Sequence, residues 1–126
     1  MGQPTEKRSF KMTTRNEINM TKKDLINAKN SSKSVKAAIT AGLVLEVLGC
    51  CVAEKAGTNK SGEPCDVGYI KTTDGIYGFT SSVMIKSLDD FADYLTDTQN
   101  DGEKVEIRFF TGNTKDGTEY YNFEIM

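Results

Sequence analysis

The pattern of hydrophobic and polar residues predicts three consecutive strands in the middle of the chain. Residues 42–57 (GLVLEVLGCCVAEKAG) are rich in Val and Leu, and a glycine at Gly49 is typical of a long strand that bends there. The turn-rich stretch TNKSGEP then leads into a second strand, CDVGYIKT. A turn that contains Asp74 and Gly75 introduces the third strand, IYGFT, because Asp-Gly supplies the positive φ angles of a two-residue hairpin loop.

A helix and two final strands follow. Apolar residues recur at spacings of three and four in VMIKSLDDFADYLTD, which predicts an amphipathic helix capped by Ser81 or Ser82. Its apolar stripe consists of Met84, Leu88, Phe91 and Leu95. The helix also carries four aspartates, which lie mostly off this stripe. We interpret them as a solvated face: Asp89, Asp90, Asp93 and Asp97. After TQNDGE, apolar and polar residues alternate within KVEIRFFTG and within TEYYNFEIM. This predicts two strands joined by NTKDG.

The N-terminal part of the chain carries one short helix. Thr21 and Asp24 form a short-acid variant of the capping box, so a helix begins within TKKDLINAK. NSSKS ends this helix, and VKAAI either adds another helical turn or leads into the first strand. We therefore expect a flexible leader at 1–15, with Met12 as an alternative native start, a basic helical segment at 16–40 and a folded domain at 41–126.

The order of these elements indicates a fold class. Three strands, a helix and two strands form the element order of the OB-fold, a five-stranded Greek-key barrel with a helix between strands three and four. The long bent first strand fits this fold, since one strand can serve both halves of the barrel. The sequence therefore predicts a mainly β, five-stranded OB-fold domain with a short N-terminal helix. An open α+β sheet with a helix on one side is the alternative.

Length and charge restrict the class of protein. The 126 residues suit a single domain, and no apolar stretch is long enough to span a bilayer or to act as a secretory signal, which favours a cytoplasmic protein without a membrane partner. The net charge is −2, yet residues 1–40 carry +6 and residues 41–126 carry −8. This asymmetry predicts a basic arm that meets an anionic partner. A solvated helix face with a flexible tail is the alternative.

The sequence contains few residues or motifs that indicate catalysis or metal binding. The chain has no histidine and none of the motifs of common hydrolases, zinc proteases or nucleotide-binding enzymes, so we expect no enzyme and no catalytic residues. Three cysteines (Cys50, Cys51 and Cys65) are an odd number for a disulfide framework, and adjacent strand residues point to opposite faces. We expect reduced thiols, no metal site and no cofactor.

Aromatic and basic residues on the strands favour binding of single-stranded nucleic acid, in which bases stack on rings and lysines follow the backbone. In the last two strands one face is wholly apolar, which leaves Phe110 and Tyr120 on the other face. Tyr69 occupies the less apolar face of the second strand. The predicted DNA-binding residues are Tyr69, Lys71, Arg108, Phe110, Lys115, Tyr120, Lys60, Lys22 and Lys23. For the three aromatic residues, packing under the N-terminal helix or in a subunit interface is the alternative.

Two segments carry a family resemblance. YIKTTDGIYGFTSSVMIKSLDDFADYL and FFTGNTKDGTEYYNFEI resemble the small single-stranded DNA-binding proteins of tailed bacteriophages, over about residues 12–126. In that family Lys71 would match a basic position and Tyr120 an aromatic one, whereas Gly78 and the acidic balance depart from it. The resemblance implies a protein that coats single-stranded DNA in replication or recombination in the host cytoplasm, with replication proteins or further copies as partners. A module that inhibits or recruits a host factor through its acidic surface is the alternative.

Overall fold

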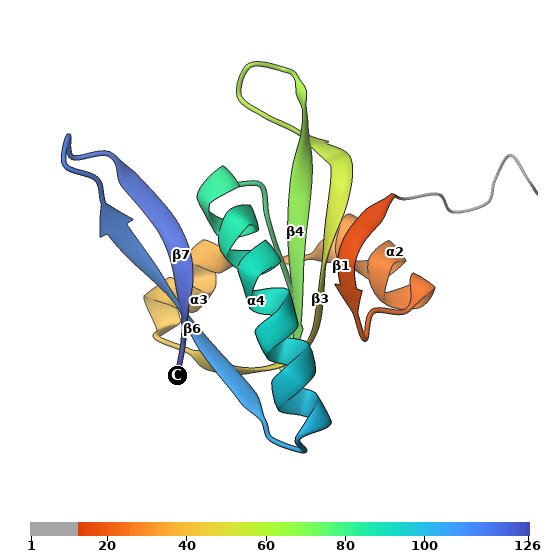
Figure 1. Ribbon diagram of the computed structural model, residues 1–126. Coiled ribbons are helices and arrows are strands. Elements are labelled where there is room, and N and C mark those ends of the chain that lie inside the picture. The colour runs from red at the N-terminus through yellow and green to blue at the C-terminus, as the bar shows by residue number, and fades with distance from the viewer. Residues whose placement is uncertain (1–12) are drawn as a thin grey trace, which may run out of the picture.

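The computed structural model describes residues 13–126, so most of the expected leader lies outside the described residues (Figure 1). Within this part of the chain, strands and helices are mixed. The helices are α2 (Lys22–Ser31), α3 (Val35–Ala41) and α4 (Ser82–Asn100). The strands are β1 (Thr14–Ile18), β2 (Lys33–Ser34), β3 (Val44–Thr58), β4 (Pro64–Thr72), β5 (Gly75–Phe79), β6 (Val105–Asn113) and β7 (Glu119–Ile125).

The strands form one curled, mixed sheet that resembles half of a barrel (Figure 1). Its order is β2-β5-β4-β3-β6-β7, and β1 pairs with β3. The strand pairs are antiparallel except for β2, which runs parallel to β5. The mainly β class and the helix between β5 and β6 are confirmed. Among residues 13–126, β7 pairs with β6 alone and β5 is covered on its outer edge only by the two residues of β2, so a seam remains between the β2–β5 edge and β7.

Strand β1 corrects the expected extent of the leader. Thr14 and Arg15, which we expected in the flexible segment, pair with Ala53 and Val52 of β3. The sequence TRNEI has no apolar alternation, so nothing local identifies it as a strand. Strand β1 forms because the second half of β3 has an edge that β6 does not cover, since β6 pairs only with Val44–Val47.

Gly49 is where β3 bends, as predicted. The register of β3 with β4 shifts between Val47 and Gly49. A Cβ atom at Gly49 would lie 2.4 Å from the backbone oxygen of Ile18 and 2.9 Å from that of Asn19. The end of β1 therefore crosses β3 at a distance that only glycine permits.

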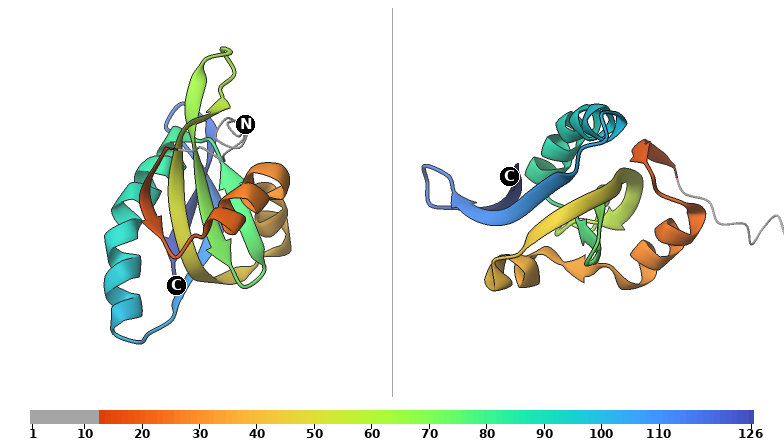
Figure 2. Two further views of the ribbon diagram at one scale, coloured as in Figure 1. Left: turned by 90° about the vertical axis from the view of Figure 1, so that its right-hand side faces the viewer. Right: turned by 90° about the horizontal axis from the view of Figure 1, so that it is seen from below.

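The sheet separates two hydrophobic clusters of unequal size. On the inner face, α4 packs its predicted stripe against both halves of the sheet, and Tyr77 of β5 meets Phe109 of β6 with ring centroids 5.4 Å apart. On the outer face, α2 covers a smaller cluster that includes Leu25, Ala28 and Tyr69. Figure 2 shows α2 and α4 on opposite sides of the sheet.

The local start and turn signals are largely confirmed. Thr21 and Asp24 form the predicted capping box of α2, with reciprocal hydrogen bonds of 3.1 Å and 3.0 Å. Ser81 caps α4. The turn between β4 and β5 differs from the prediction by one residue, because Thr72 pairs with Gly75 and leaves Thr73 and Asp74 as the loop. Gly75, with φ +126°, is the first residue of β5.

Candidate nucleic-acid interface

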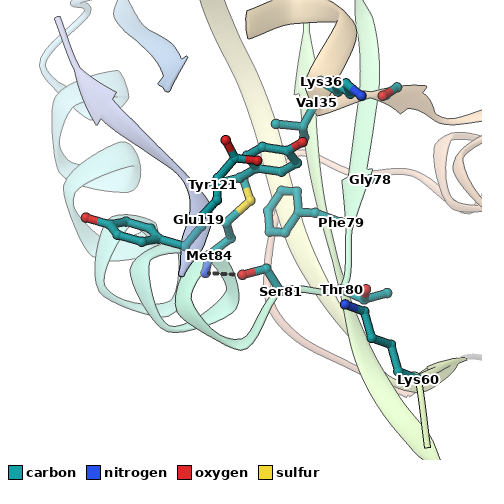
Figure 3. A pocket seen from close by; sticks show the side chains of 12 residues that line it. Val35, Lys36, Lys60, Gly78, Phe79, Thr80, Ser81, Met84, Glu119 and Tyr121 are labelled. Atoms are coloured by element: carbon teal, nitrogen blue, oxygen red, sulfur yellow. Dashed lines mark hydrogen bonds between the residues drawn. The ribbon is translucent and has the colours of Figure 1, made fainter. Parts of the chain in front are cut away.

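A cleft of about 610 Å³ lies along the seam between β5 and β7 (Figure 3). One wall comes from β2, the start of α3 and β5, and the other from the first residues of β7. The first turn of α4 also lines the cleft. At this turn, Ser81 Oγ accepts a hydrogen bond from the backbone N–H of Met84. The cleft therefore exists because the curl of the sheet stops short of closure.

The floor of this cleft is apolar. Val35, Phe79 and Met84 line it and are all buried, with exposed fractions of 5%, 8% and 0%. Tyr121 of β7 is partly buried and packs against the same core. The ring of Tyr121 and the ring of Phe79 face the same space in Figure 3. A planar apolar group could therefore enter between the two edges of the sheet.

The rim of the cleft is polar and carries two lysines. Lys36 of α3 and Lys60 of the β3–β4 loop are both exposed and lie toward opposite ends of the cleft (Figure 3). Neither forms an ion pair with a carboxylate of the described residues. Glu119 is the acidic residue on this rim. The two ammonium groups are thus available to an anionic chain that crosses the cleft.

Tyr120 is the second residue of β7, beside the β6–β7 loop, and contributes to the cleft wall. It pairs with Gly112 across the hairpin. A Cβ atom at Gly112 would lie 2.5 Å from Cζ of the Tyr120 ring, so the ring occupies the space above this glycine. By the register, Phe110 and Arg108 share the same sheet face as Tyr120. The structure therefore places three predicted site residues together on the outer face of β6 and β7.

Arg108 forms an ion pair with a residue of the neighbouring strand, whereas Lys115 in the loop of this hairpin forms none with a described residue. Arg108 Nη2 donates to Glu124 Oε2 at 2.7 Å, an exposed pair that contributes little to stability. Lys115, at the hairpin tip, is exposed and has no carboxylate partner among residues 13–126. The β3–β4 and β6–β7 hairpins project from the same end of the molecule in Figure 1. Lys60 and Lys115 thus belong to loops at one end of the molecule.

Tyr69 and Lys71 do not reach this region. Tyr69 is 5% exposed because α2 covers it, and this burial raises the pKa of its hydroxyl. Lys71 Nζ contacts Asp24 Oδ2 of α2 at 2.9 Å. For Tyr69 the alternative of packing under the N-terminal helix describes the structure. Both residues are therefore omitted from the interface proposed below.

Lys22 and Lys23 also lie apart from the cleft. They occupy the exposed first turn of α2, which covers the outer face of β3 and β4. Sequence reasoning missed Lys36, Thr80 and Tyr121 as cleft residues. No local signal could have identified them, because the cleft forms only when β5, α3 and β7 meet across the seam.

Part of the basic N-terminal segment has a structural role. Arg15 donates to Asp89 of α4, to Glu54 of β3 and to Asp66 of β4, at 3.0–3.1 Å. These bonds, with the Asp89 bond as the largest contribution, hold the pKa of the guanidinium above its ordinary value. The backbone N–H of Lys55, and then Arg15, lower the pKa of the Asp66 carboxyl. Arg15 therefore fastens β1 to the domain.

The three cysteines differ in how deeply they are buried. All three are free, and Cys50 and Cys51 are fully buried on opposite faces of β3, as predicted. Burial raises the pKa of each of these two thiols to about 12. Within residues 13–126, no three Cys, Asp or Glu side chains are arranged to hold a metal ion. None of the helices there is long and apolar enough to cross a membrane.

Comparison with known proteins gives no relative. No family model, no curated protein and no solved structure matches this chain. The resemblance to phage single-stranded DNA-binding proteins stays a prediction, and the function has to be argued from the cleft.

Proposed function

We propose that this protein is a non-catalytic single-stranded DNA-binding protein, and that the strand crosses the cleft between β5 and β7. The observation that carries the proposal is the pair of exposed lysines, Lys36 and Lys60, toward the two ends of a cleft with an apolar floor. Single-stranded nucleic acid is bound by this combination, because lysines neutralise phosphates while bases contact apolar or aromatic side chains.

The dimensions of the cleft suit this ligand. Its volume of about 610 Å³ lies within the range of about 300–1,000 Å³ that is usual for ligand pockets. A base could contact Phe79 and Tyr121 while its phosphates pass Lys36 and Lys60 on the rim. The first turn of α4 also faces the cleft, and the partial positive charge of a helix N-terminus favours phosphate. A base pair has no exposed ring faces to offer, so duplex DNA should bind less well.

The arrangement of strands supports the proposal of an OB-type barrel. The long β3 pairs with both β4 and β6, β5 follows β4, and α4 connects β5 to β6. This is the connectivity expected for the five strands of an OB-fold, to which β1 and β2 are additions. In OB-folds the first and last hairpin loops flank the ligand; here Lys60 of the β3–β4 loop lines the cleft, and the β6–β7 loop with Lys115 projects from the same end of the molecule.

The proposed mechanism is protection by occupancy. Contacts to phosphates and to ring faces do not distinguish one base from another, so sequence preference should be low. A protein of this kind would serve replication or recombination by keeping single strands unpaired and shielded. It would need no cofactor for this.

A titration of a fluorescent oligo-dT and of a duplex of equal length at low salt tests the proposal. We expect the single strand to bind and the duplex to bind more weakly. The charge-reversed variant K36E/K60E should lose most of the affinity, whereas K22E/K23E, with the same change in net charge on α2, should retain it. Absence of oligo-dT binding by the parent chain would overturn the proposal, and equal losses in the two variants would place the strand elsewhere.

A further inference from the structure

The exposed face of α4 combines apolar surface with acidic groups. A shallow groove between α4 and β7, of about 320 Å³, is lined mainly by aromatic and aliphatic side chains: Phe91, Tyr94, Phe123 and Ile125. Tyr94 and Ile125 are 42% and 45% exposed, which is high for such large apolar groups. Asp90 and Asp97 are exposed one helical turn before and after Tyr94, and the exposed Asp93 lies one turn from each of these two aspartates. None of these three aspartates forms an ion pair with a described residue.

The exposed face of α2 has the opposite charge around a similar apolar centre. Ile26 is 40% exposed on this helix. Lys22 and Lys29 lie four residues before and three residues after it, and Lys23 lies three before it, so all three surround Ile26 on the helix surface. They are exposed, and none contacts a carboxylate of the described residues. Asp24, the acid of this helix, faces inward toward Lys71.

The two faces cannot meet within one molecule. Helix α4 packs on the inner face of the sheet and α2 on the outer face, and both views of Figure 2 place the sheet between them. Their charges therefore remain unpaired in the monomer, at opposite sides of the molecule.

We infer that the α4 face is a docking surface for the α2 face of a second copy of this chain. Ile26 would enter the groove beside Tyr94 and Ile125, and three lysines would meet three aspartates around it. The contact joins two different surfaces, so it is heterologous and leaves one α2 face and one α4 face free at the ends. Copies would thus add head to tail. The inference does not depend on DNA binding, since neither face includes Lys36 or Lys60.

Sedimentation of the full chain without DNA tests the inference. At low ionic strength the weight-average mass should rise about two-fold or more with protein concentration, because a heterologous contact that does not close keeps adding copies. In about 1 M salt, where the Debye length is about 3 Å, the mass should return to that of the monomer. A mass that stays monomeric at low salt and high protein concentration would overturn the inference.

Charge reversal identifies the surfaces. K22E/K23E/K29E and D90K/D93K/D97K should each remain monomeric alone, since both of their faces then carry the same sign. An equimolar mixture of the two variants should associate again, as should a single chain that carries all six changes. Each variant is checked for folding by its thermal melt, and the six-fold variant keeps the test decisive if one triple variant is unstable.

A control separates specific docking from net charge. K36E/K60E/K115E changes the charge by the same amount as the α2 variant but lies at the cleft and the β6–β7 loop, so it should associate like the parent chain. Loss of association in this control, or a mixture that stays monomeric, would overturn the inference. Association of the parent only with proteins of other kinds, and never with itself, would do so as well.

Discussion

Tyr120 fills the space above Gly112, where any other residue would place a side chain. Tyr120 is only partly buried, it is one of the residues that line the cleft, and it belongs to neither core cluster. Phe123, three residues later on the same strand, is 8% exposed and packs edge-on against Phe91 with centroids 5.3 Å apart. Two aromatic residues of one strand therefore have different roles.

Substitution by alanine should separate these roles. Tyr120→Ala should change the melting temperature little but weaken oligo-dT binding by about 1–3 kcal/mol if the ring stacks on a base. Phe123→Ala should lower the free energy of unfolding by about 3–5 kcal/mol because it empties part of the core. A thermal melt beside a titration for each variant measures both effects. If Tyr120→Ala melts as early as Phe123→Ala, the ring has a packing role.

Gly49 and Gly112 provide a second comparison, between a glycine that faces backbone and one that faces a side chain. Gly49→Ala should destabilise the fold by at least about 1–3 kcal/mol, because the new methyl group would collide with the carbonyl of Ile18, which cannot rotate away. Gly112→Ala should cost less, since the Tyr120 ring can move. Denaturant unfolding of both variants tests this, and a larger loss for Gly112→Ala would contradict it.

Helix α2 is attached to the sheet through a charged contact as well as through apolar packing. The backbone N–H of Thr21, followed by Lys71, lowers the pKa of the Asp24 carboxyl. A carboxyl whose pKa is lower in the folded than in the unfolded state stabilises the fold above its unfolded pKa, about 4, and this contribution is lost as the pH falls through the folded pKa. Low pH should therefore weaken the attachment of α2 to the sheet.

The variant Asp24→Asn should test this attachment. It should be less stable than the parent at pH 7, and its stability should fall less steeply between about pH 5 and pH 2, because the group that titrates there is gone. Asp93→Asn, which removes an exposed carboxylate of α4 that forms no ion pair with a described residue, is the control. Melting temperatures across this range measure the effect. Parallel pH curves for the parent and Asp24→Asn would contradict it.

At the level of elements, the sequence predicted what depends on local periodicity. The five strands β3 to β7, helix α4 and the cap of α2 follow from alternation, from a stripe at spacings of three and four, and from Thr21 with Asp24. Strands β1 and β2 were not predicted. Their residues carry no pattern of their own and become strands only because the edges of β3 and β5 are available.

The candidate site shows the same limit. Lys60 and Tyr120 could be selected from the sequence because loop position and strand face are local properties. Whether a face is open or covered is not local: the face of Tyr69 alternates like that of Phe110, yet α2 covers only the former. Lys36 was missed because its place at the cleft depends on how α3 meets the seam.

For the whole molecule, the open seam predicts how affinity depends on salt. Each phosphate neutralised on a single strand contributes about 0.7 to the slope of log affinity against log salt. Lys36→Ala and Lys60→Ala should each reduce the slope by about that amount, whereas Lys22→Ala should leave it unchanged. Titrations of oligo-dT at several salt concentrations measure the slopes. An equal reduction of this slope for Lys22→Ala would show that α2 belongs to the DNA interface.

The adjacent thiols of β3 offer a consequence for how the molecule comes apart. Cys50 faces the larger cluster under α4, and Cys51 faces the smaller cluster under α2. Native proteins open in parts, and a small cluster opens at lower cost than a large one. An alkylating reagent at rising denaturant should therefore modify Cys51 before Cys50, as read by peptide mass mapping. Simultaneous modification would mean that both clusters unfold together. The reactivity of each of these two neighbouring thiols thus reports on the unfolding of one side of the sheet.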